Sequence, residues 1–402
     1  MQKLSFQFHN LDFFTILSSK GANFFVTSAI FYIAREENIN FAQFGLNWSI
    51  ALFLGGIIIG TLSPAIIRLL FTMGGKSWIA KYTFDLNNFL KGILLFLFLI
   101  IFFGTFEWFK LFWLGFFINT SIVIISILRA ISAYKIVLIS SAVYIFTTIG
   151  SLFIFKVLID LDYLSALVCS YLISTLIISA ISLVPIKAFI CSADIGRFNL
   201  NNFIETYLSY FFLNVFSFGV MTLDFVMLER VLNKTQFDIF GGAKIYLDRF
   251  LIPFLSVIVG TITINFLRHE SSSSTGNAYI ALSKLGLKEV IAFITFLSLG
   301  LVGYYIFNII FQLVEIPQET IFLLIIGYML FSLNAIYLDV IIIKYSLYFI
   351  TMMFVGFFVF YLSLIYSFII LFGPQGWAIA FLLANLLILI ALVYLTSSIS
   401  KR

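Results

Sequence analysis

Five charged side chains lie inside long apolar stretches of this sequence, where a charge is costly and therefore informative. They are Lys20, Asp224, Lys244, Asp248 and Arg249. A charge at membrane depth costs about 2.5–3.5 kcal/mol on insertion scales, so such residues usually face a polar cavity or an oppositely charged partner. We therefore expect these five residues to mark either an ion-pair network or a binding site for a charged ligand.

The spacing of these charges indicates which of them share a helix face. Lys244 and Asp248 are four residues apart and can pair. Arg249 points about 100° away from its neighbour and is left to meet either Asp224 or a substrate anion. Polar side chains accompany two of the charges at helical spacing. Ser19, Asn23 and Thr27 lie beside Lys20, and Tyr210, Asn214 and Ser217, together with the apolar Met221, share one face with Asp224.

Two interpretations of this set remain open. In the first, Lys20 and Arg249, with Lys244, form a cationic patch that binds a diphosphate, because cations in a low-dielectric cavity favour a polyanion. In the second, Asp224 and Asp248 neutralise most of the cations by interhelical pairing. The residues predicted to line the cavity or to form ion pairs are Asn23, Thr27, Asn214, Ser217, Asp224 and Asp248.

Composition identifies the elements that must position these residues. The 402 residues are 62% hydrophobic and 10% charged, with a mean hydropathy of +1.13, which no soluble domain sustains. The long unbroken apolar runs argue against a barrel, and the chain has room for about 12 membrane-spanning helices. We predict helices over 12–34, 41–68, 89–105, 110–128, 135–156, 163–187, 204–227, 240–267, 287–311, 320–342, 345–371 and 376–397.

The distribution of Lys and Arg predicts the orientation of the helices. With both termini in the cytoplasm, fifteen of the 23 basic residues fall on the cytoplasmic side and five outside, the outer ones being Arg35, Lys110, Lys156, Arg230 and Lys234. We therefore predict an all-α polytopic protein with an N-in, C-in topology. Its five tryptophans fall near predicted helix ends, which is typical of interfacial anchors.

The two halves of the sequence also repeat. Arg35 precedes a short loop and the pair Phe44-Gly45 at a helix start, and Arg230 precedes Phe240-Gly241 in the same way. Both sets lie on the same predicted side, which indicates two parallel six-helix lobes and favours alternating access. We predict an N-terminal lobe over 1–190, a cytoplasmic linker over 191–203 and a C-terminal lobe over 204–402.

The sequence predicts neither enzymatic chemistry nor a bound cofactor. Cys169 lies inside an apolar run and Cys191 just beyond the next one, so neither a disulfide framework nor a four-ligand metal site is expected, and the pattern indicates no catalytic residue. The basic residues, which give a net charge of +5, are scattered among short loops, so a nucleic-acid partner is not expected.

Two stretches resemble a known family. The segment IFYIAREENINFAQFGLNWSIALFLGGIIIGTLSPAIIRLL (30–70) is similar to the first two helices of Wzx-type O-antigen flippases, the polysaccharide branch of the MATE-like MOP exporter superfamily. The segment TLDFVMLERVLNKTQFDIFGGAKIYLDRFLIPFLSVI (222–258) resembles that family's seventh and eighth helices, with Asp224 at the aspartate position. The family more often has a Tyr after the junction Gly, and this chain has Gly242.

The resemblance implies a function and a location. Such a protein would move an undecaprenyl-diphosphate-linked oligosaccharide, the O-antigen repeat unit of lipopolysaccharide, from the cytoplasmic to the periplasmic leaflet of the bacterial inner membrane. Its partners would be this lipid-linked substrate, membrane lipids and other assembly proteins such as the polymerase and the chain-length regulator.

Two alternatives share the composition. An O-antigen polymerase or another polytopic glycan enzyme should have a large outer loop, whereas the longest one predicted here runs only from about 228 to 239. A MATE-like multidrug exporter for organic cations should have a carboxylate-dominated cavity, whereas three cations accompany two anions here.

Overall fold

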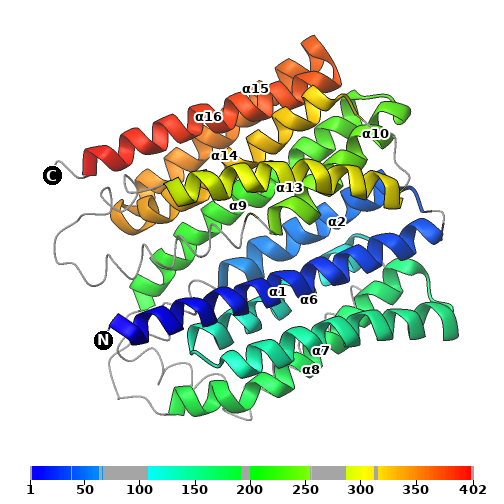
Figure 1. The fold of residues 1–402 in the computed structure, drawn as a ribbon, viewed down its shortest axis with the longest axis vertical. Helices are drawn as coiled ribbons and strands as arrows, with labels where there is room; N and C mark the ends of the chain where they lie inside the picture. Colours follow the sequence, from blue (N-terminus) through cyan, green and yellow to red (C-terminus); the bar gives the residue numbers. More distant parts are fainter. Residues whose placement is uncertain are drawn as a thin grey trace. The chain divides into compact units, whose positions relative to one another are not determined.

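The computed structural model describes residues 2–37, 39–62, 66, 107–191, 200–253, 255, 287–311 and 316–399. Within these ranges the chain forms 11 helices and no strand (Figure 1). They are α1 (Gln2–Glu36), α2 (Phe41–Gly55) continued by the π-helical η1 (Gly56–Gly60), α6 (Glu107–Ala130), α7 (Tyr134–Phe153) continued by η2 (Ile154–Leu158), α8 (Tyr163–Cys191), α9 (Leu200–Val231), α10 (Lys234–Ile245) continued by η3 (Tyr246–Leu251), α13 (Leu287–Phe311), α14 (Gln318–Lys344), α15 (Leu347–Phe372) and α16 (Pro374–Ile399).

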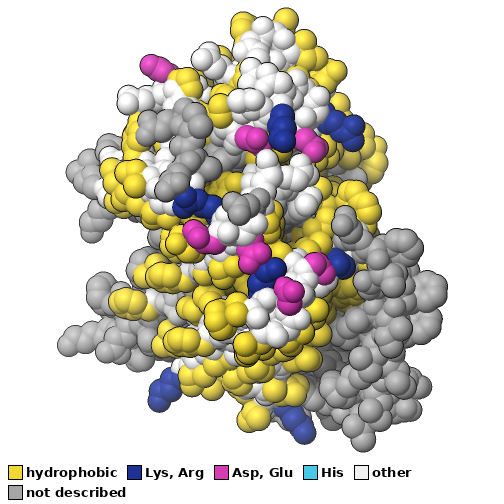
Figure 2. Space-filling model, turned by 90° about the vertical axis from the view of Figure 1, so that its right-hand side faces the viewer, with side chains coloured by type: hydrophobic (Ala, Val, Ile, Leu, Met, Phe, Trp, Pro, Cys, Tyr) yellow, Lys and Arg dark blue, Asp and Glu magenta, His cyan; other side chains and the backbone are white. Residues whose placement is uncertain are grey.

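Each of these helices overlaps one predicted from the sequence, and the predicted helix over 89–105 lies outside the described residues. Eight of the helices are long and apolar enough to cross a membrane. Large hydrophobic side chains such as Phe146 and Ile309 are exposed by 76% and 74%, and hydrophobic side chains cover much of the surface in Figure 2. The all-α, polytopic prediction is confirmed, and the chain is a multi-pass membrane protein.

Helix ends differ from the prediction where polar residues continue a helix beyond its apolar stretch. α9 extends to Val231 and α10 begins at Lys234, so residues 232 and 233 are all that remains of the loop predicted over 228–239. The side chain of Asn233 accepts a hydrogen bond from Gln236 N at 2.9 Å and caps α10. α8 and α9 likewise extend into the predicted linker, 191–203, from both sides.

The helices group into two compact units, and the first comprises Met1–Ile30 and Asn47–Phe218. In this unit α8 packs against both α6 and α7. α2 crosses α6 where two glycines meet, because a Cβ on Gly55 would lie 2.1 Å from the Gly115 carbonyl carbon. Small residues allow such close backbone approach between membrane helices.

The second unit comprises Phe31–Leu46 and Gly219–Arg402. In this unit α16 packs against α14 and α15. The two predicted Phe-Gly junctions meet here: a Cβ on Gly45 would lie 2.3 Å from the Ile245 side chain, and one on Gly241 would lie 2.6 Å from Ala42 Cβ. These glycines allow the start of α2 to lie close to α10.

The division into units does not follow the predicted lobes, because the segment 31–46 packs with the second half of the chain and α9 is divided at Phe218. The landmarks of the predicted repeat do recur. α1 and α9 each have an Arg in the last turn, and α2 and α10 each continue into a π-helical segment. The lobe boundaries at 190 and 203 stay a prediction.

Candidate functional site: a buried charge cluster

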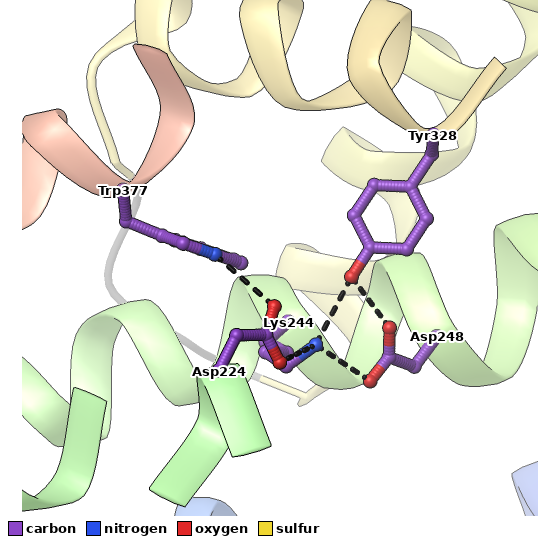
Figure 3. Close-up of polar contacts among 5 residues, drawn as sticks. All are labelled: Asp224, Lys244, Asp248, Tyr328 and Trp377. Carbon is purple, nitrogen blue, oxygen red and sulfur yellow. Dashed lines mark hydrogen bonds and ion pairs between the residues drawn. The ribbon is translucent and has the colours of Figure 1, made fainter. Parts of the chain in front are cut away.

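The second unit contains a buried network around Lys244, which we call the Lys244 cluster: Asp224, Lys244, Asp248, Tyr328 and Trp377 (Figure 3). The Lys244 ammonium lies 2.9 Å from Asp224 Oδ1 on α9 and 2.9 Å from Asp248 Oδ2, one turn along its own helix. The side chains of Lys244 and Asp224 are 0% exposed. One cation therefore holds two carboxylates together in the interior.

Two further helices complete the polar contacts of the cluster. Tyr328 Oη, on α14, accepts a hydrogen bond from Lys244 Nζ at 3.1 Å and donates one to Asp248 Oδ1 at 2.5 Å. Trp377 Nε1, on α16, donates to Asp224 Oδ2 at 3.3 Å. These donors offset part of the desolvation cost that both carboxylates incur on burial.

Aromatic rings surround the ammonium group. Lys244 Nζ lies 5.7 Å from the ring centroids of Phe225 and Trp377 and 5.8 Å from that of Tyr328. A desolvated cation at such distances is attracted to the negative faces of the rings by about 2 kcal/mol. Lys244 is thus stabilised as a charged group without access to water.

The two carboxylates and the one ammonium of the cluster give it a formal charge of one negative. Arg249 follows Asp248 on η3, is partly exposed, and interacts electrostatically with Asp248 and Tyr328. Counting Arg249 brings the set to two anions and two cations. The charges of these four groups therefore balance one another.

The first unit contains the other predicted residues. Lys20, on α1, is partly exposed and forms no hydrogen bond or ion pair with any described residue, while the charge of Arg129 on α6 acts on it. One turn further on, Asn23 Oδ1 accepts a hydrogen bond from Tyr144 Oη at 3.4 Å, and Thr27 is 4% exposed. Lys20 is therefore a partly exposed cation within α1 that has a cationic neighbour.

The polar face of α9 is only partly engaged. Asn214 Nδ2 donates to Thr61 Oγ1, next to η1, at 3.1 Å, and Ser217 is partly exposed. Farther along the helix, Asp224 belongs to the Lys244 cluster.

Comparison with known proteins adds the fold. No protein-family model matches the chain, and no curated protein matches its sequence significantly. A crystal structure of a MATE in complex with Br-NRF matches with a TM-score of 0.62 and 14% identity, covering 98% of this chain and 96% of that one. A multidrug resistance MATE family transporter of the MOP superfamily, in an outward-facing conformation, matches with a TM-score of 0.59 and 14% identity, covering 97% and 96%. The chain has a MATE transporter fold.

In this MATE-like fold, part of the sequence-predicted site is brought together. The predicted pair of Lys244 and Asp248 is present, and Asp224 joins it. The sequence leaves Arg249 to pair with Asp224 or with a substrate anion. In the structure Asp224 pairs with Lys244, because the Lys244 ammonium reaches the carboxylates of both Asp224 and Asp248. Lys20 belongs to the first unit and Arg249 to the second, so their shared cationic patch stays a prediction.

Two members of the cluster are not predicted by the sequence patterns. Tyr328 carried no pattern of its own, since its partners are 80 and 84 residues away in sequence. Trp377 was interpreted as an interfacial anchor, and this is wrong: the residue is 0% exposed and bound to Asp224. Trp48 and Trp113 are also buried, whereas Trp108 is 66% exposed, as expected of an anchor. A helix-end position thus does not distinguish a lipid-facing indole from one packed inside.

Proposed function

We propose that this protein is an exporter that moves an undecaprenyl-diphosphate-linked oligosaccharide, an O-antigen repeat unit, from the cytoplasmic to the periplasmic leaflet of the bacterial inner membrane. The observation that carries the proposal is Lys20. It is a partly exposed cation within α1, it has no carboxylate partner among the described residues, and Arg129 adds positive charge nearby. A cation that the protein leaves uncompensated at membrane depth favours an anionic ligand.

In this proposal the residues have different roles in binding the substrate. Lys20, with Arg249 contributing from the second unit, holds the diphosphate of the substrate. The partly exposed polar groups of α1 and α9, including Asn23, Asn214 and Ser217, offer hydrogen bonds to the sugars. Lys244 is fully buried and shared between two carboxylates, so we assign it to the framework and not to the substrate.

The pathway partners follow from this proposal. The lipid tail would remain among membrane lipids, and the delivered repeat unit would pass to a polymerase and a chain-length regulator. Transport would proceed by alternating access without a cofactor. The two-residue connection between α9 and α10 disfavours a polymerase with a large loop at that position.

A multidrug exporter of the same fold is the second candidate. The observation that favours it is the excess of carboxylates in the Lys244 cluster, since Asp224 and Asp248 face a single lysine. An organic cation that displaced or supplemented Lys244 would meet two anions. The two candidates thus differ in the sign of the substrate charge.

The decisive experiment is complementation in a bacterium that lacks its own flippase and carries the cognate repeat-unit pathway. Surface polysaccharide is measured for wild type, Lys20→Ala, Lys20→Arg and Arg249→Ala at matched membrane abundance. The matched control is Lys135→Ala, which removes an exposed lysine from α7. We expect wild type, Lys20→Arg and the control to restore surface polymer, whereas Lys20→Ala and Arg249→Ala should restore at least about tenfold less, as expected when a charged contact to the substrate is lost.

Efflux of ethidium from the same cells separates the two candidates. Restored polymer without ethidium efflux supports the flippase. Efflux that depends on Asp224, with no restored polymer, would instead establish the drug exporter.

A further inference from the structure

A polar pocket of about 270 Å³ lies in the second unit, apart from the Lys244 cluster, where the α1–α2 and α9–α10 connections come together. Its walls come from the start of α2, the end of α9 and the first turns of α10. Figure 2 shows side chains of both charges gathered on the face in view, over a largely hydrophobic surface. The volume is just below the range of about 300–1,000 Å³ that holds drug-sized ligands, so the pocket suits a single small ring.

The frame of this pocket is fixed by hydrogen bonds. Asn40 Oδ1 accepts from Gln43 N at 2.9 Å and caps α2, while Asn40 Nδ2 donates to Asp238 Oδ1 at 3.0 Å. The connection into α10 is held by the Asn233 cap. Both helix starts are therefore fixed before any ligand binds, which reduces the entropy cost of binding.

The remaining polar groups of the pocket are uncommitted. Glu229, Lys234, the Gln43 side chain and the second carboxylate oxygen of Asp238 form no hydrogen bond or ion pair with any described residue. Opposite charges thus line one small pocket without pairing with each other. Phe237, which is 5% exposed, adds an apolar patch to the lining.

This combination selects a chemical class of ligand. Two carboxylates against one lysine make the pocket net negative, which disfavours a phosphate or another anion. The ammonium of Lys234 in the same pocket disfavours a metal ion, and so does the bond that already occupies one Asp238 oxygen. The pocket offers carboxylates that accept hydrogen bonds, an ammonium that donates them and an amide that does both. This set fits a ring with several hydroxyl groups, and the C–H face of such a ring can lie against Phe237.

We propose that this pocket binds one uncharged sugar residue. Arg35, Arg230 and Lys234 place these connections on the predicted outer side. The sugar would be part of an oligosaccharide delivered to the periplasm, and in this respect the proposal rests on the proposed function. Glu229 and Asp238 accept hydrogen bonds from hydroxyl groups, and Lys234 and Gln43 donate to ring or hydroxyl oxygens.

The test is saturation-transfer NMR on the purified full-length protein in lipid nanodiscs. The probes are galactose, glucose and N-acetylglucosamine as free sugars at millimolar concentration. The test variant is Glu229→Ala, and the matched control is Glu36→Ala, which removes an exposed carboxylate from the last turn of α1 without touching the pocket. A titration with Mn²⁺, followed by its paramagnetic resonance, tests the metal-ion alternative.

We expect transfer to at least one of the sugars, retained in Glu36→Ala and weakened about tenfold or more in Glu229→Ala, as the loss of a hydrogen bond to a charged group implies. No transfer to any of the three sugars overturns the proposal, and so does equal transfer to both variants. Mn²⁺ binding that Glu229→Ala abolishes, without sugar transfer, would identify a cation site instead.

Failure of this proposal and failure of the proposed function are distinguishable. If surface polymer is restored but no saturation transfer to a sugar is seen, the flippase function is supported and the sugar pocket is refuted. Pocket-dependent sugar transfer without restored polymer leaves a sugar site on a protein with another substrate.

Discussion

Replacement of Lys244 by Met should destabilise the protein more than any other single change in the Lys244 cluster. The ammonium makes two contacts of 2.9 Å, each with an attraction of about 6 kcal/mol at an effective dielectric constant of 20. Met has a similar length but leaves Asp224 and Asp248 buried together without a cation. Entry of water or uptake of a proton by one carboxylate reduces the repulsion between the two. The expected net loss in the free energy of unfolding on breaking a buried pair is therefore about 3–5 kcal/mol.

The expected shift in melting temperature follows from the size of the chain. With an unfolding entropy of about 2.1 cal/mol/K per residue over 402 residues, a loss of 3–5 kcal/mol lowers the melting temperature by about 4–6 °C. The measurement is thermal unfolding of the purified protein in detergent, followed by tryptophan fluorescence at neutral pH.

The comparison with a second variant tests the charge argument itself. Asp248→Asn leaves one cation with one anion, and the amide oxygen can still accept the hydrogen bond from Tyr328. The free energy of unfolding of this variant should therefore fall by less than about 2 kcal/mol. A triple variant, Asp224→Asn, Lys244→Met and Asp248→Asn, should recover part of the stability that Lys244→Met loses. The reasoning fails if Lys244→Met melts within about 1 °C of wild type, or if Asp248→Asn is the more destabilising change.

Three further predictions concern other contacts. Asp162→Ala should lower the free energy of unfolding by about 1 kcal/mol at neutral pH, because the carboxylate caps α8. Burial alone would raise the pKa of Asp162, but hydrogen bonds from Ser165 and Lys110 keep this pKa below its usual value. The melting temperatures of wild type and variant should therefore approach each other only below about pH 4, where the carboxylate begins to be protonated. Gly115→Ala should cost about 3 kcal/mol in thermal unfolding, since its Cβ would lie 1.7 Å from a backbone oxygen of α2, and an unchanged melting temperature would contradict this close crossing. Trp377→Phe should cost about 1–3 kcal/mol by removing the donor to Asp224, and the same melting assay on Trp108→Phe, an exposed position, is the control.

The sequence predicted the helices well because a membrane imposes both their length and their apolar composition. For α14 the predicted span, 320–342, ends within two residues of the observed one, Gln318–Lys344, on both sides. The errors lie at ends such as that of α9, where polar residues beyond the apolar stretch continue the helix and the N-cap Asn233 begins the next one. Hydropathy contains no information on these residues, because they lie outside the apolar part of each helix.

The site was predictable only within one helix. Spacing of four residues was enough to pair Lys244 with Asp248, since helical periodicity brings them to the same face. The contact between Asp224 and Lys244 depends on how α9 packs against α10, and Trp377 reaches Asp224 across 153 residues of sequence. Periodicity within a single helix cannot specify which face of a distant helix it meets.

The division into two units has a mechanical consequence. It runs through the middle of helices: between Ile30 and Phe31 in α1, between Leu46 and Asn47 in α2, and between Phe218 and Gly219 in α9. Each of these three helices therefore belongs in part to both units, and its backbone hydrogen bonds continue from one unit into the other. A proline at one of these three positions would remove a backbone hydrogen bond and clash with the preceding turn, so it would break a helix that both units share without touching any ligand.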